Sequence, residues 1–189
     1  IALHPHIGSE LSVTWGLQQS ALVSAAFTFL GETAHAGVAP WKGRDALDAV
    51  VLMDAGLAQF REHMEPTSRM HRVITEVGVQ PNVVARRASM WWYFRDPSAN
   101  GARGLFEQAK RCAQGAALMT NTQWQHQVLS AVWPMRSNQV AAQIVQNNID
   151  TVGHPAWAAD DVALARRLQE RCAHVADAVP RRSLQRPAG

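Results

Sequence analysis

The chain has 189 residues, of which 47% are hydrophobic and 17% charged, and its formal net charge is +3. No apolar run is long enough for a membrane span, and no charged and then apolar leader precedes a small-residue cleavage site. Although the sequence pI is about 9.4, the basic residues are scattered and do not follow one face. We therefore expect a soluble, cytoplasmic protein that binds neither membranes nor nucleic acids.

The first half of the chain predicts a strand followed by a helix. Residues 24–30 alternate small or polar with aromatic side chains, as a strand does. From Asp45, a plausible N-cap, apolar residues recur at spacings of three and four, which predicts a helix that ends at Pro66. The residues on its apolar face are Ala46, Val50, Met53, Leu57, Phe60 and Met64.

The second half predicts two strands, a helix and a fourth strand. Residues 71–77 and 88–95 are β-rich runs joined by a connection containing glycine, proline and asparagine. In the second run Met90, Trp92 and Phe94 share one face, and Trp91, Tyr93 and Arg95 share the other. The next helix has Leu105, Ala109, Cys112 and Ala116 on one side, and residues 123–132 form the last strand.

This order of elements predicts an α+β fold over residues 22–133. Strand, helix, strand, strand, helix, strand is the ferredoxin-like split βαβ arrangement, a four-stranded antiparallel sheet with two helices on one face. Such a sheet leaves its other face and an edge strand uncovered, so we expect dimerisation or docking.

The flanking segments, 1–21 and 134–175, are too short to be domains of their own. Residues 136–152 and 160–175 predict two helices, and the Arg/Pro-rich tail, 176–189, is expected to be disordered. We expect the flanks to be parts of a larger domain. Cys112 and Cys172 lie far apart in helix-like segments, which predicts two reduced, buried core residues and no disulfide.

A single histidine, His35, is the first candidate functional residue. It follows the first strand, and small neighbours, Ala34, Ala36 and Gly37, leave room around its ring. This setting favours contact with a ligand or partner over core packing.

Several motifs occur in an order and spacing that resemble a known family. They are residues 31–36 (GETAHA), 40–50 (PWKGRDALDAV), 80–84 (QPNVV), 93–95 (YFR), 114–120 (QGAALMT) and 153–157 (GHPAW). The chain resembles, over about residues 1–172, the co-catalytic zinc amidohydrolases and exopeptidases. This family includes aminoacylases, glutamate carboxypeptidases and indole-acetyl-amino-acid hydrolases.

The resemblance implies that residues 22–133 are a lid and dimerisation domain inserted into an α/β catalytic domain. Segments 1–21 and 134–175 would then be fragments of that catalytic domain, which holds two divalent metal ions, zinc or manganese. The expected partners are a second copy of the chain in a homodimer, possibly a second type of subunit, and a small-molecule acyl-amino-acid substrate.

The resemblance also assigns roles to four residues. His35 matches a catalytic histidine that reaches across the dimer and stabilises the oxyanion of the hydrolysed amide. Asn82 and Arg95 match substrate-binding residues, with Arg95 on a carboxylate. His4 matches a metal ligand, and His6 takes that place if the register is shifted. A turn-stabilising asparagine and a solvated strand-end arginine are the alternatives for Asn82 and Arg95.

The implied function is the lid and dimerisation portion of a metal-dependent amidohydrolase. It would cleave the amide bond of N-acyl or p-aminobenzoyl amino acids with an acyl-glutamate-like structure. The family's remaining ligands and its general-base glutamate have no match here, so we do not expect activity from this chain alone. The alternative is a non-catalytic ferredoxin-like dimerisation or interaction module. An RNA-binding sheet is a further alternative, but Trp91 and Tyr93 have only Ser89 and Arg95 as same-face strand neighbours.

Overall fold

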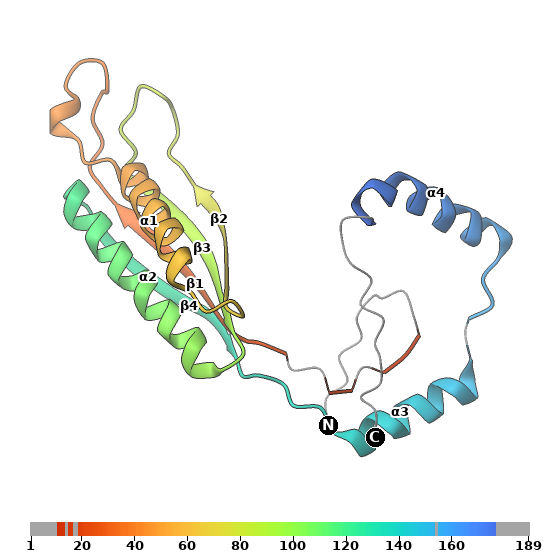
Figure 1. Ribbon diagram of the computed structural model, residues 1–189. Helices are drawn as coiled ribbons and strands as arrows, with labels where there is room; N and C mark the ends of the chain where they lie inside the picture. Colours follow the sequence, from red (N-terminus) through yellow and green to blue (C-terminus); the bar gives the residue numbers. More distant parts are fainter. Residues whose placement is uncertain (1–10, 14, 17–18, 154, 177–189) are drawn as a thin grey trace. The chain divides into compact units, whose positions relative to one another are not determined.

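The computed structural model describes residues 11–13, 15–16, 19–153 and 155–176, and the chain divides into two compact units. One unit comprises residues 14–139, and the other comprises 1–13 and 140–189. The larger unit contains all four strands (Figure 1). Its elements are β1 (Ala21–Leu30), η1 (Pro40–Lys42), α1 (Ala46–Phe60), η2 (Arg61–His63), β2 (Arg69–Glu76), β3 (Arg87–Asp96), α2 (Ala99–Thr120) and β4 (Gln123–Val132).

The four strands form one antiparallel sheet in the order β2-β3-β1-β4. Both helices cover the same face of this sheet (Figure 1). The predicted α+β class and the four-stranded sheet with two helices are confirmed. We call the side of the sheet that faces away from the helices the outer face.

The core lies between the sheet and the two helices. Strand residues that alternate along β1 and β3 point into it, because successive side chains of a strand lie on opposite faces. Its strand contribution is Ala25, Phe27, Phe29, Ala88, Met90, Trp92 and Phe94, all 0–1% exposed. The Phe27 and Phe94 rings meet edge to face at 6.4 Å between centroids, and Trp92 stacks on Phe94 at 5.9 Å. The predicted division of β3 into two faces is confirmed.

Helix α1 begins as its sequence predicts and ends earlier. Asp45 is the N-cap, and its Oδ1 accepts a hydrogen bond from the Leu47 amide at 2.8 Å. The helix ends at Phe60, because the chain tightens into the 3₁₀ turn η2 before Pro66 is reached. Phe60 and Met64 still pack against the core, although Met64 is no longer helical.

Helix α2 is capped at both ends. The Ser98 hydroxyl accepts from the Gly101 amide at 2.9 Å, and Asn121 closes the C-terminus with a left-handed φ of 52°. Cys112 on this helix is partly buried, and burial raises the pKa of its thiol. Both cysteines are free, as predicted. The prediction that both are buried is wrong for Cys172, which is exposed on a helix of the other unit.

The smaller unit contains helices α3 (Gln139–Val152) and α4 (Ala159–Ala176) in the places where two helices are predicted. Within it the Val13 amide donates to the Gln146 side-chain oxygen at 2.9 Å. Residues 177–189 lie outside the described residues, so the expected disorder of the tail stays a prediction. Among the described residues, no helix is both long and apolar enough to cross a membrane.

Candidate functional site

His35 lies in a pair of loops at the end of the sheet where β1 ends and β3 begins. These distal loops are residues 31–45 and 77–86. Their backbones are joined from Gly31 outward: the Gly31 amide donates to Arg86 O at 2.8 Å, Val84 N to Ala34 O at 3.0 Å, and Ala36 N to Asn82 O at 2.9 Å. The ladder of the sheet therefore continues outward and fixes the backbone at His35 beside that at Asn82.

The first distal loop is closed on itself by a second set of backbone bonds. Glu32 and Arg44 exchange two hydrogen bonds, of 2.9 and 2.8 Å. A Cβ atom on Gly31 would lie 1.8 Å from the Arg44 carbonyl oxygen, so only glycine permits this close approach. The glycine that opens the GETAHA motif is therefore required by backbone geometry.

The imidazole of His35 is exposed and oriented by its own loop. Its Nδ1 accepts a hydrogen bond from the Gly37 amide at 3.2 Å, and its backbone oxygen accepts from Val38 N and Ala39 N. Because Nδ1 is the acceptor, the neutral ring carries its proton on Nε2. The neutral ring therefore keeps an N–H donor on an exposed side chain.

Asn82 contributes to the loops through its backbone. The Asn82 carbonyl accepts from the Ala36 amide, and Val83, the residue after Asn82, forms an isolated β-bridge with His35. The residue itself is exposed, and its side-chain amide has no hydrogen-bond partner among the described residues. Asn82 can therefore offer both amide hydrogens and the amide oxygen to a ligand.

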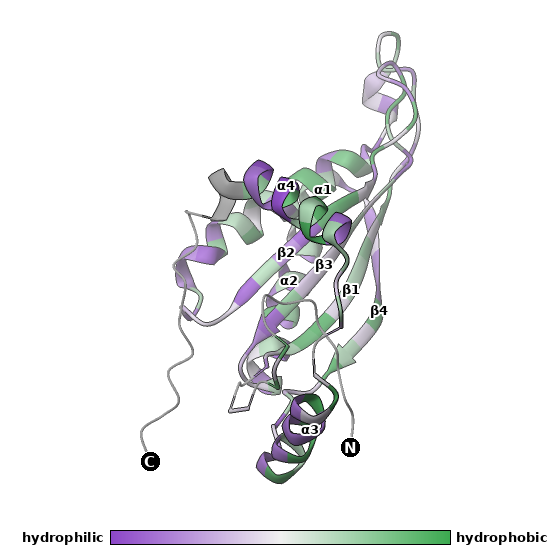
Figure 2. Ribbon diagram, turned by 90° about the vertical axis from the view of Figure 1, so that its right-hand side faces the viewer, coloured by the Kyte–Doolittle hydropathy of each residue, from purple (hydrophilic) through white to green (hydrophobic). Residues whose placement is uncertain are grey.

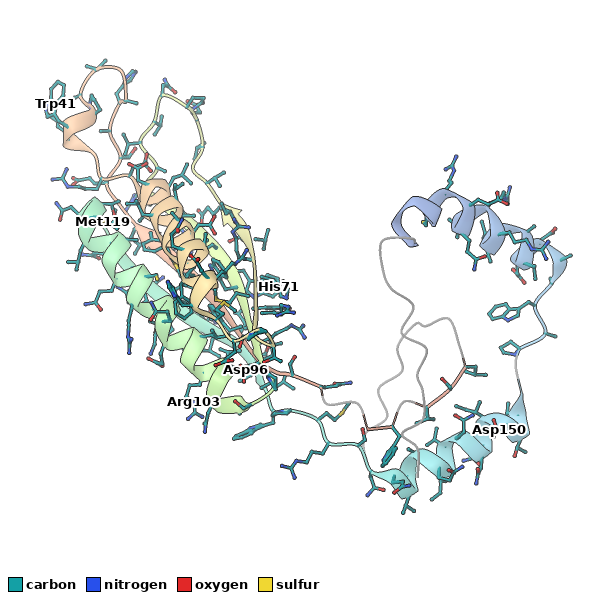
Figure 3. All side chains as sticks on the ribbon, in the orientation of Figure 1. Trp41, His71, Asp96, Arg103, Met119 and Asp150 are labelled. Carbon is teal, nitrogen blue, oxygen red and sulfur yellow. The ribbon has the colours of Figure 1, made fainter. Side chains whose placement is uncertain are left out.

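Arg95 lies at the other end of the sheet. It pairs with Leu22 near the start of β1, whereas the distal loops follow the pair Leu30–Arg87. Eight residues separate these pairs along each strand, which is about 26 Å at a rise of about 3.3 Å per residue. In Figure 3 Trp41 marks the distal loops, and Asp96, next to Arg95, marks the opposite, proximal end. One copy of the chain does not bring Arg95 to His35.

The side chain of Arg95 rests on the outer face against aromatic residues. Its guanidinium carbon is 5.6 Å from the centre of the Tyr93 ring, a cation–π distance. Tyr93 in turn meets Trp91 edge to face at 5.3 Å, and the Trp91 indole N–H donates to the Ser24 hydroxyl at 2.8 Å. Arg95 is partly buried on this aromatic surface, whereas a freely solvated strand-end charge would be exposed.

A buried carboxylate that sequence reasoning missed holds the proximal end together. Asp96 Oδ2 accepts from the Ser68 hydroxyl at 2.6 Å, and Oδ1 accepts from the Ser98 amide and hydroxyl at 2.8 Å. Burial disfavours the charge, but these hydrogen bonds outweigh it and lower the pKa of Asp96. The only sequence signal was an Asp two residues before a helix cap.

The described residues do not form a metal centre. Among them no group of three or more His, Cys, Asp or Glu side chains could hold a metal ion. His4 and His6, the predicted ligand and its alternative, lie outside the described residues. The donor set present therefore does not fit a two-metal site.

Comparisons with known proteins agree with the motifs. The family model for the peptidase dimerisation domain of the M20 type matches residues 17–117, which is more than half of the chain. A p-aminobenzoyl-glutamate hydrolase subunit of Escherichia coli (strain K12) is 32% identical over 150 residues, covering 79% of this chain and 31% of that protein. The Xaa-Arg dipeptidase of Mus musculus is 39% identical over 92 residues, covering 49% and 21%.

The fold is also similar to that of a solved structure. The aminobenzoyl-glutamate utilization protein from Klebsiella pneumoniae aligns with a TM-score of 0.57 and 22% identity over 85% of this chain and 46% of that one. The chain spans about a third, or less, of the length of the curated relatives it matches. The fold, the ordered motifs and the family match lead to one conclusion: this chain belongs to the M20-type peptidase dimerisation domain family.

Proposed function

We propose that this chain is the lid and dimerisation portion of a metal-dependent amidohydrolase. Its substrates would be N-acyl or p-aminobenzoyl amino acids with an acyl-glutamate-like structure. The observation that carries the proposal is the pair of distal loops, whose backbone ladder holds His35 beside Asn82 while the Gly37 amide binds Nδ1 of the exposed His35 ring. The similarity to a p-aminobenzoyl-glutamate hydrolase supports the choice of substrate.

His35 supplies an oxyanion donor in this proposal. Negative charge develops on the carbonyl oxygen when an amide is attacked, and an N–H donor fixed beforehand lowers the barrier. The Gly37–His35 hydrogen bond provides that fixation, because it holds the tautomer and the ring orientation before substrate arrives. Asn82 donates from the neighbouring loop, and Arg95 binds a substrate carboxylate with its planar fork.

His35 and Arg95 can serve one active site only if two subunits share it. Strand β2 is an edge of the sheet formed by the described residues, and Met70 is the one buried residue of this strand. Helix α1, which is hydrophobic along most of its length (Figure 2), exposes Val51 and Leu52. The Arg72–Asp54 ion pair, with Nη2 and Oδ2 2.6 Å apart, joins β2 to α1 at this surface. We assign the homodimer interface to the β2 edge and the exposed side of α1.

A two-fold axis beside β2 would bring the distal end of one protomer close to the proximal end of its partner. Antiparallel pairing of β2 with its symmetry mate reverses the direction of the second sheet. The distal loops of one protomer then lie toward the proximal end of the other. His35 and Asn82 of the partner subunit would thus act with Arg95 of the first.

The metal chemistry must come from elsewhere. The family match supports an enzyme of the metal-dependent peptidase and amidohydrolase type. We propose two divalent ions, zinc or manganese, held by residues other than the described ones, and we assign no catalytic step to them. Segments 1–21 and 134–175 would belong to the domain that holds them, with His4 among the ligands. Two free cysteines suit the cytoplasm as the compartment.

A chimera tests the proposal. Residues 20–133 of this chain replace the matching segment of the similar E. coli hydrolase, and hydrolysis of p-aminobenzoyl-glutamate is measured. We expect metal-dependent hydrolysis that His35→Ala lowers about a hundredfold or more, while sedimentation shows an intact dimer. His63→Ala, an exposed histidine of η2 that lies outside the distal loops and the strands, is the matched control. Unchanged turnover in His35→Ala would contradict the role of this residue, and a dimer without hydrolysis would favour a non-catalytic dimerisation module.

A further inference from the structure

Two arginines face each other across β2 and β3 at the proximal end of the outer face. Arg69 is the register partner of Arg95, and His71 is the partner of Tyr93. Directly opposed residues of antiparallel strands project to the same face, with Cβ atoms about 4.5–5.5 Å apart. In Figure 3 His71 projects from β2 on the side away from the helices. Arg69 and Arg95 therefore lie next to each other on that side.

We propose that Arg69 and Arg95 form a clamp for a dicarboxylate, so that the hydrolase selects acyl amino acids that carry a second carboxylate. The reaction rests on the proposed function, but the binding of the anion does not. Arg69 lies outside the motifs that carry the family resemblance. Its role follows from the strand register and from the charges around it.

Among the residues that the structure describes, neither arginine of this pair forms an ion pair. Among the strand residues of that face, Glu76 is the only carboxylate, and its Oε2 accepts from Arg87 Nε at 2.8 Å, near the distal end. Asp96 follows Arg95, but its side chain lies on the helix side, with both oxygens bonded to serines. Like charges directly opposite in a sheet repel, and a bound anion removes that repulsion.

The two guanidinium groups are also held in place. Arg69 Nη1 donates to Ser68 O at 2.6 Å and to Pro66 O, which leaves the other edge of the fork for a ligand. Arg95 lies over Tyr93. The Ser68–Asp96 hydrogen bond ties together the residues that adjoin the two arginines. The pair is thus fixed before an anion arrives, which reduces the entropy lost on binding.

A pair of isosteric probes tests the clamp directly. N-acetyl-glutamate and N-acetyl-glutamine differ only in the second carboxylate, and each is titrated into the whole 15N-labelled chain while the arginine Nε–H signals are followed. We expect N-acetyl-glutamate to shift the Arg69 and Arg95 signals with one common Kd and to bind about fivefold more tightly than N-acetyl-glutamine. Added salt should reduce the difference.

Variants decide whether Arg69 acts as proposed. Arg69→Gln should lower the affinity for N-acetyl-glutamate about fivefold and leave that for N-acetyl-glutamine nearly unchanged. Arg87→Gln, on the same face, should change neither. The clamp is refuted if both probes bind with equal affinity or if the Arg69 signal does not move. It is also refuted if Arg69→Gln and Arg87→Gln have equal effects. If a single-stranded oligonucleotide shifts the Arg69 and Arg95 signals and binds more tightly than N-acetyl-glutamate, with a strong dependence on salt, the arginine pair is a nucleic-acid site and the dicarboxylate clamp is refuted.

The chimeric enzyme separates this inference from the proposed function. There, Arg69→Gln should raise KM for the acyl-glutamate substrate about fivefold without changing that for its acyl-glutamine counterpart. Binding of N-acetyl-glutamate to the chain together with an inactive chimera would leave the clamp standing and refute the proposed function. An active chimera that Arg69→Gln leaves unchanged would refute the clamp alone.

Discussion

The two ends of the sheet present their functional side chains by different physical means. At the distal end, backbone hydrogen bonds between two loops fix His35 and Asn82, and glycines permit the close approach. At the proximal end, the buried carboxylate of Asp96 joins Ser68, just before β2, to Ser98, the N-cap of α2, beside Arg95. Added side-chain bulk should therefore destabilise the fold at the distal end, and protonation of Asp96 should destabilise it at the proximal end.

The largest effect should come from adding one carbon at the distal end. Gly31→Ala places a Cβ 1.8 Å from the Arg44 carbonyl oxygen, so the backbone must move, and we expect a loss of about 3 kcal/mol in the free energy of unfolding. Chemical denaturation measures it. Gly37→Ala is the control on the same loop, because its Cβ would meet only His35 at 3.5 Å. Equal effects of the two variants would contradict the backbone account.

The proximal end should be weakened by neutralising its carboxylate. Asp96→Asn loses the charge that accepts three hydrogen bonds, and we expect a loss of about 2 kcal/mol at pH 7. Since folding lowers the pKa of Asp96 below its ordinary value of 3.8, its contribution is present above that pH. It is lost as the pH falls through the folded pKa.

Urea denaturation at several pH values checks this dependence. The difference in stability between wild type and Asp96→Asn should be constant from about pH 7 to about pH 5 and shrink below about pH 4. The wild-type and Gly31→Ala curves should instead stay parallel, since no acid group holds Gly31. A difference for Asp96→Asn that grows on acidification would refute the assignment.

The dimer surface offers the next largest effect. Val73 is 51% exposed on the β2 edge, and a lysine there should hinder strand pairing between subunits. We expect Val73→Lys to weaken the dimer about tenfold or more in sedimentation experiments. Val79→Lys, in a distal loop and 91% exposed, should leave the dimer unchanged. If Val79→Lys weakens the dimer and Val73→Lys does not, the interface lies at the distal loops.

The smallest effect is expected at Gly104, one of two glycines of α2 that can be compared. A Cβ on Gly101 would lie 2.1 Å from Asp96 Oδ1, whereas nothing lies within 4 Å of one on Gly104. Gly101→Ala should therefore displace the Asp96 carboxylate and destabilise the fold by about 2 kcal/mol, and Gly104→Ala should stabilise it by about 0.5 kcal/mol through the unfolded state. Thermal unfolding measures both. Two changes of the same sign would contradict the close packing of Gly101 on Asp96.

Periodicity explains why the elements could be predicted and the contacts could not. The alternation of residues 88–95 predicts which side chains of β3 are buried, and the spacing of three and four after Asp45 does the same for α1. The buried residues of both elements confirm these predictions. The end of α1 at Phe60 depends on a 3₁₀ turn that no spacing announces. The Ser68–Asp96 bond and the Arg69–Arg95 pair depend on strand register, which brings together residues far apart in sequence.

The central claim is that His35 of one protomer acts with Arg95 of the other, and mixed dimers test it most directly. Two inactive chimeras, His35→Ala and Arg95→Ala, are mixed under conditions that exchange subunits. In each mixed dimer one site regains both residues, so random pairing should restore about a quarter of wild-type hydrolysis. If mixing adds nothing to the activity of the separate variants, His35 and Arg95 do not share a site across the dimer.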